Sequence, residues 1–151
     1  MADTNTISVI ESLLETVEDG KIGFAEAADK LDQDGNPTLA AEMRELSQER
    51  LRMANELRSL ATAEGVSIGN GEGTVAGAVH RGWMSFRDAI SGDDAHAVLA
   101  AAEQGEDHAV AEFERALESE VPTAVRAVIE RQYAEVRAAH DRVRDLRDSN
   151  K

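Results

Sequence analysis

Asp34-Gly35-Asn36-Pro37 decides the fold, because it separates two long segments with helical periodicity. Glycine and proline end a helix, and Pro37 suits the first turn of the next one. The preceding segment, residues 6–32, and the following one, residues 38–64, both repeat apolar side chains at intervals of three and four. Since so short a turn leaves two helices side by side, the sequence predicts an antiparallel hairpin.

A second pair of helices is predicted on either side of Val121-Pro122. Residues 93–120 begin with an acidic pair, Asp93-Asp94, which suits the positive end of a helix dipole. Helical periodicity resumes after the proline and lasts to Leu146, while residues 148–151 are expected to fray. Together the four segments predict an all-α protein.

About 28 residues, 65–92, connect the two predicted hairpins. Their first half is rich in glycine, and residues 74–90 again repeat apolar side chains at helical spacing. A helix of that length covers about 25 Å at 1.5 Å per residue, so the connection can run along the bundle. Such a long helical crossover is typical of a ferritin-like four-helix bundle. His80 and Trp83, one turn apart, are predicted to anchor it on the bundle.

The composition excludes several classes of partner. The chain of 151 residues carries 16 basic and 30 acidic side chains, and its net charge of −14 repels nucleic acid and anionic membranes. Cysteine is absent, so disulfides, thiolate metal sites and cysteine nucleophiles are excluded. No segment is apolar enough to span a membrane and the N-terminus has no basic leader. We therefore expect a single cytoplasmic domain over residues 1–151.

Short motifs distributed along the chain carry a family resemblance. They are Val17-Glu18-Asp19-Gly20, Gly23-Phe24-Ala25-Glu26-Ala27-Ala28, Ala78-Val79-His80-Arg81-Gly82-Trp83, Gly105-Glu106-Asp107, Arg131-Gln132-Tyr133 and Ala139-His140-Asp141-Arg142-Val143. Together they resemble a bacterial family of unassigned function, a domain of unknown function within the ferritin-like superfamily. The resemblance covers almost the whole chain. It implies the four-helix fold with a helical crossover and a non-catalytic, stress-related role, and it implies no established activity.

The usual di-iron site of ferritin-like proteins is not present in the sequence. Such sites combine a Glu from each of two helices with a Glu-x-x-His motif from each of the other two. The four histidines are His80, His96, His108 and His140, and the residues three positions earlier are Gly77, Asp93, Gly105 and Arg137. Because no Glu-x-x-His occurs, the ligands of that site cannot be transferred to this chain.

Polar side chains nevertheless fall on the apolar stripes near the middle of the predicted helices. Arg50, Glu106 and Gln132 occupy stripe positions on the second, third and fourth helices, and Gly20-Lys21 occupies one on the first. Helix midpoints share one level in a bundle whatever the helix directions, so a buried polar layer is predicted. An unpaired charge there would cost several kcal/mol, so Glu106 needs a cation or a proton.

Two hypotheses follow for this layer. The favoured one is an internal salt bridge between Arg50 and Glu106 that sets the register of the helices. The alternative is a degenerate iron or manganese site. Its ligands would be Glu18, Glu106 and His140, with Asp19, Glu49 or Glu103 as further carboxylates. Since Arg50 and Lys21 would repel a divalent cation, no cofactor is expected.

No catalytic or cofactor-binding residue is identified. Gly69, Gly71 and Gly73 lack the Gly-Lys-Ser/Thr context of a phosphate-binding loop. The sequence therefore favours a non-catalytic protein. One alternative is a metal-binding protein or oxidase of the di-iron or di-manganese carboxylate type. The other is an interaction module that forms a homo-oligomer through an alanine-rich face.

Overall fold

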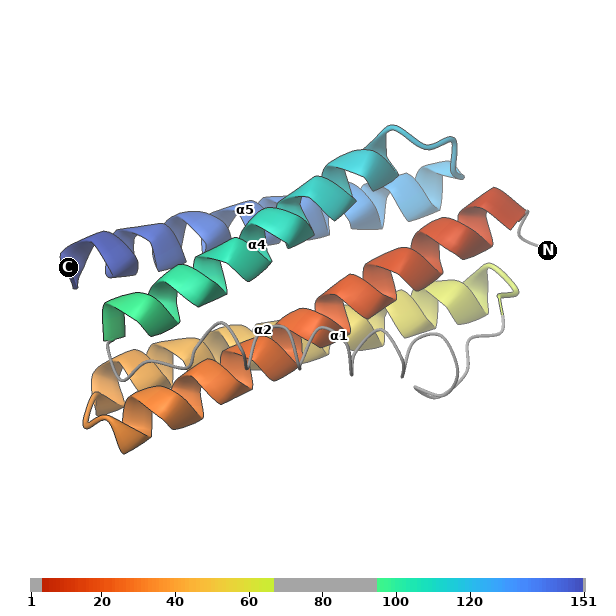
Figure 1. Ribbon diagram of the computed structural model, residues 1–151. Helices are drawn as coiled ribbons and strands as arrows, with labels where there is room; N and C mark the ends of the chain where they lie inside the picture. Colours follow the sequence, from red (N-terminus) through yellow and green to blue (C-terminus); the bar gives the residue numbers. More distant parts are fainter. Residues whose placement is uncertain (1–3, 67–94, 151) are drawn as a thin grey trace.

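The computed structural model describes residues 4–66 and 95–150, and within them four long helices lie side by side (Figure 1). These helices are α1 (Thr4–Gln33), α2 (Pro37–Ala63), α4 (Ala95–Leu117) and α5 (Thr123–Ser149). The described residues contain no strand. The prediction of an all-α helical fold is confirmed for this part of the chain.

The helices form two antiparallel hairpins, α1 with α2 and α4 with α5 (Figure 1). Helix α1 also packs closely on α4, whereas α2 approaches α5 more loosely, and the two remaining pairs lie across the diagonals of the bundle. Helix α2 ends at one end of the bundle and α4 begins at the other (Figure 1). The predicted helical crossover, with His80 and Trp83, falls on residues 67–94, which lie outside the described residues.

Glycines end both helices of the first hairpin through their backbone conformation. Gly35 has a φ of +82° and Gly65 a φ of +76°, values that L side chains rarely adopt. After each glycine the next backbone N–H bonds back into the helix: Asn36 donates to the Leu31 carbonyl at 2.8 Å, and Val66 donates to the Ala61 carbonyl at 2.7 Å. This is the Schellman arrangement, which satisfies carbonyls that the helix itself leaves unpaired.

Helix α4 ends earlier than the sequence pattern predicts. The sequence pattern extends to residue 120, but α4 ends at Leu117. Arg126 from the first turn of α5 donates hydrogen bonds to the carbonyls of Leu117 at 2.8 Å and Ser119 at 2.7 Å. The guanidinium therefore binds carbonyls at the helix end and holds the turn between α4 and α5.

The expectation of a frayed C-terminus was also wrong up to residue 149. Helix α5 continues to Ser149, whose hydroxyl donates to the Asp145 carbonyl at 2.9 Å. The side-chain amide of Asn150 donates to the Leu146 carbonyl at 2.8 Å. These side chains add hydrogen bonds to carbonyls in the last turns of the helix.

The buried apolar side chains form two clusters along the bundle axis. One cluster contains Leu13, Leu14, Met53, Leu57, Phe113 and Ile129 among others. The second contains Phe24, Leu31, Met43, Leu99 and Val143 among others. Arg50 and Glu106 are buried at the level between the two clusters, and buried Gln132 lies on α5 between Ile129 and Val136, toward the first. Among the described helices, none is long and apolar enough to cross a membrane.

Candidate functional site

An ion pair between Arg50 and Glu106 lies at the centre of the bundle. Arg50 comes from α2 and Glu106 from α4, two helices that face each other across a diagonal. Arg50 Nη2 donates a hydrogen bond to Glu106 Oε2, and the two side chains are only 1% and 2% exposed. Burial raises the pKa of the Glu106 carboxyl, while the charge and hydrogen bond of Arg50 oppose that rise. The long arginine side chain thus joins helices whose backbones do not touch.

Helix α1 provides the space that Arg50 occupies. A Cβ atom at Gly20 would lie 2.6 Å from Arg50 Nη1, closer than real Cβ contacts allow. One turn further along α1, the ring of Phe24 lies under the guanidinium, with 5.3 Å between Arg50 Cζ and the ring centroid. A cation over an aromatic face is attracted to it. A glycine at this position of α1 therefore leaves room for the guanidinium, whereas a larger residue would require Arg50 to shift.

Lys21 does not join the central ion pair. Its Nζ lies 2.7 Å from Glu18 Oε2 on the same helix, and Arg58 Nη2 of α2 lies 2.8 Å from Glu18 Oε1. Burial tends to raise the pKa of Glu18, but the hydrogen bonds from Lys21 and Arg58 lower it below its usual value. Glu18 is therefore an ionised carboxylate with two cationic partners.

Gln132 bonds to α2 rather than to the central pair. Its Nε2 donates to the Met53 carbonyl at 3.2 Å and to Glu56 Oε1 at 2.7 Å. Arg131 Nη1 reaches the same carboxylate at 3.0 Å, and these contacts lower the pKa of Glu56. The predicted polar layer is therefore made of two separate parts, the Arg50–Glu106 pair and a Gln132–Glu56 contact between α5 and α2.

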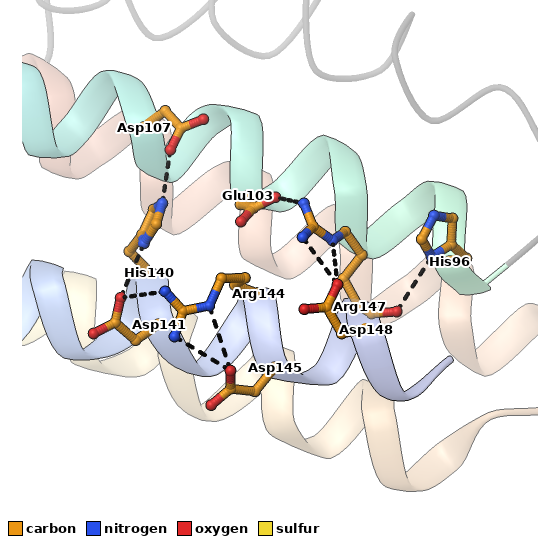
Figure 2. A network of polar contacts seen from close by, with 9 residues as sticks. All are labelled: His96, Glu103, Asp107, His140, Asp141, Arg144, Asp145, Arg147 and Asp148. Atoms are coloured by element: carbon orange, nitrogen blue, oxygen red, sulfur yellow. Dashed lines mark hydrogen bonds and ion pairs between the residues drawn. The ribbon is translucent and has the colours of Figure 1, made fainter. Parts of the chain in front are cut away.

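His140 belongs to a row of polar contacts between α4 and α5 (Figure 2). Its Nε2 lies 2.7 Å from Asp107 Oδ1 and its Nδ1 lies 3.2 Å from Asp141 Oδ1. Because carboxylates only accept hydrogen bonds, both ring nitrogens must donate, which favours the protonated ring. Burial tends to lower the pKa of His140, but the bonds to Asp141 and Asp107 raise it overall.

Further along the same row, Arg147 of α5 joins several groups (Figure 2). Its guanidinium pairs with Glu103 of α4 and with Asp148, the latter at 2.9 Å. The Arg147 carbonyl accepts a hydrogen bond from His96 Nδ1 at 3.2 Å. This row therefore fastens α4 to α5 by contacts between side chains of opposite charge.

The residues proposed as metal ligands lie in three different environments. Glu18 binds Lys21 and Arg58, Glu106 binds Arg50, and His140 binds two aspartates. Within residues 4–66 and 95–150, no group of three or more His, Asp or Glu side chains is arranged to hold a metal ion. A dication next to Glu106 would also face the Arg50 charge. These residues therefore do not fit a shared di-metal centre.

A pocket of about 290 Å³ opens between α1 and α4, with Arg50 from α2 as part of its lining. Its walls are made largely of small and apolar residues, which include Gly20, Gly23, Phe24, Ala101, Ala102 and Gly105. Arg50 Nε and Nη1 are buried and have no hydrogen-bond partner among the described residues. An unmet buried donor costs about 1–3 kcal/mol. The facing glycines of α1 and α4 were the sequence signal for this pocket, and the sequence prediction missed it.

The comparison with known proteins identifies a family for most of the chain. A family described as a domain of unknown function (DUF2383) matches residues 5–119, which include α2, α4 and all of α1 except Thr4. No curated protein matches the chain. The predicted membership in a domain family of unknown function is confirmed, and the match assigns no activity.

The central ion pair leads to a prediction about stability. We expect Glu106→Gln and Arg50→Met each to lower the free energy of unfolding by about 3–5 kcal/mol, because each leaves the other group buried without its partner. The double variant Arg50→Met/Glu106→Leu should come close to the parent protein or exceed it. Chemical denaturation of the four proteins measures this. A cost below about 1 kcal/mol for Glu106→Gln would contradict a buried ion pair.

Two helical glycines provide a matched comparison. Gly20→Ala should destabilise the fold by about 1–3 kcal/mol, because its Cβ collides with Arg50. Gly105→Ala meets no atom within 4 Å and should stabilise α4 by up to about 1 kcal/mol. Thermal unfolding of both variants gives the comparison. Equal shifts in Tm would show that Gly20 is not needed for the arginine.

The contacts of His140 predict a pH dependence of stability. Its pKa in the folded state is raised above the ordinary value of 6.5, so its stabilising contribution is complete below that value. The contribution is lost as the pH rises through the raised pKa. Unfolding free energies measured from pH 5 to 9 should therefore fall more in the parent protein than in His140→Gln. Parallel curves would show that the histidine contributes nothing.

Proposed function

The chain belongs to the DUF2383 family, and we propose that it is a non-catalytic, ferritin-like helical bundle that binds a small molecule between α1 and α4. The observation that carries this proposal is the incomplete hydrogen bonding of Arg50 beside a pocket. Two of its nitrogens are buried without a partner among the described residues. A ligand with an acceptor atom in the pocket would satisfy one of these donors and fill a space that the small side chains leave open.

The helix arrangement supports the ferritin-like part of the proposal. Helices α2 and α4 point in the same direction, so the chain between them connects opposite ends of the bundle (Figure 1). Helix α1 packs against both α2 and α4. Two antiparallel hairpins joined by one long connection are characteristic of ferritin-like bundles.

Binding of iron or manganese by Glu18, Glu106 and His140 is the less favoured function, and an oxidase activity depends on it. Arg50 neutralises Glu106, and the other two residues bind elsewhere. The cytoplasmic location, the stress-related role and the homo-oligomer stay predictions. A non-catalytic role agrees with a buried charged pair whose two members bind each other.

The alanines around the pocket allow a direct test of ligand binding. Ala101, Ala102 and Ala109 line the pocket, whereas Ala54 and Ala61 are buried away from it on α2. We expect at least one fragment from a library of uncharged, anionic and cationic molecules to shift the methyl NMR signals of the first three alanines. The signals of the last two should stay in place.

A pair of leucine variants controls for binding elsewhere. Gly105→Leu places a side chain in open space at the pocket, and Ala111→Leu places the same side chain on the exposed face of α4. The methyl shifts should disappear in the first variant and persist in the second. If no fragment at millimolar concentration shifts the pocket methyl signals, the binding function is wrong.

A further inference from the structure

We propose that the ligand of the α1–α4 pocket is an uncharged molecule with one hydrogen-bond acceptor, directed at Arg50, and an apolar body. This inference rests on the binding function proposed above and identifies its ligand class. Three properties of the pocket favour this ligand: its charges, the position of the arginine donors, and the nature of its walls.

The charges around the pocket disfavour an ionic ligand. Glu106 already pairs with Arg50, and the Asp19 carboxylate also lines the pocket. An anionic ligand would approach two carboxylates of its own charge. A cationic ligand group would find no acceptor at Arg50, because the guanidinium can only donate hydrogen bonds. An uncharged acceptor, such as an amide or ketone oxygen, avoids the repulsion by the carboxylates and can accept from Arg50.

The position of the arginine selects an acceptor rather than a donor. Arg50 Nη1 would lie 2.6 Å from a Cβ atom placed on Gly20. Gly20 itself lines the pocket. An oxygen atom at the pocket wall beside Gly20 would lie close to this Arg50 N–H group, which is buried and has no hydrogen-bond partner within residues 4–66 and 95–150. Hydrogen bonds from a charged donor to an acceptor are stronger than those between neutral groups.

The remaining walls suit an apolar body of modest size. Phe24, Ala101, Ala102 and Ala109 contribute aromatic and methyl surfaces. The volume of about 290 Å³ lies at the lower end of the range for small-molecule pockets. A single substituted ring matches that size better than a nucleotide or a polysaccharide.

Four probes with the same ring separate the effects of ligand charge and of the hydrogen-bond acceptor on binding. Benzamide is uncharged and has an acceptor, benzoate is an anion, benzylammonium is a cation, and ethylbenzene has no acceptor. Dissociation constants follow from titrations of the Ala101, Ala102 and Ala109 methyl signals. We expect benzamide to bind about tenfold more tightly than each of the other three, the effect of one charge-assisted hydrogen bond.

Variants test the role of Arg50 directly. In Arg50→Met/Glu106→Leu the donor is gone and the core stays apolar, so benzamide should bind no more tightly than ethylbenzene. The parent protein alone already decides the ligand class, whether or not that variant folds. Tightest binding by benzoate or benzylammonium would overturn the uncharged ligand, and equal binding of benzamide and ethylbenzene would overturn the hydrogen bond.

The proposed function fails separately from this inference. If none of the four probes and no library fragment shifts the pocket methyl signals, both proposals are wrong. If other fragments shift those signals but benzamide does not lead its series, the pocket binds ligands and only the ligand class is wrong.

Discussion

The structure depends on one constraint: two opposite charges taken out of water must meet each other. Arg50 and Glu106 are buried between two apolar clusters, and neither could remain there alone without a large desolvation cost. Their contact requires α2 and α4 to keep one longitudinal register, although these helices lie on a diagonal. An apolar contact could slide by a turn, but this ion pair cannot. The pair therefore specifies the alignment of the two hairpins more than it adds to stability.

Apart from the central ion pair, arginines bind acidic side chains of neighbouring helices. Several of them bind a carboxylate on a neighbouring helix, as in Arg58 with Glu18, Arg131 with Glu56, Arg142 with Glu42 and Arg147 with Glu103. Single exposed ion pairs contribute little to stability, so their effect lies in favouring the native pairing of helices. With 30 acidic and 16 basic side chains, the chain still has a net charge of −14.

Periodicity predicted the helices well because each long helix buries one face. The placement of Arg50 and Glu106 on buried stripes could also be anticipated, since charges at core positions need a partner. Contacts that depend on how far a long side chain extends from its helix could not be anticipated from the sequence. Arg126 of α5 donates hydrogen bonds to carbonyls at the end of α4, and Gln132 donates to Glu56 instead of binding the central ion pair. The pocket combines residues of α1, α2 and α4, and its sequence signal, the glycines of α1 and α4, is divided between two segments.

The space that Gly20 leaves for Arg50 has a consequence for how this chain can change over generations. Positions 20, 50 and 106 sit on three helices, yet a substitution at one alters what the others tolerate. A side chain at position 20 fits more easily once the arginine at position 50 has been replaced by a shorter residue. A shorter residue at position 50 in turn is better tolerated once position 106 has lost its charge. The order in which such substitutions occur therefore matters, which is epistasis produced by a single buried side chain.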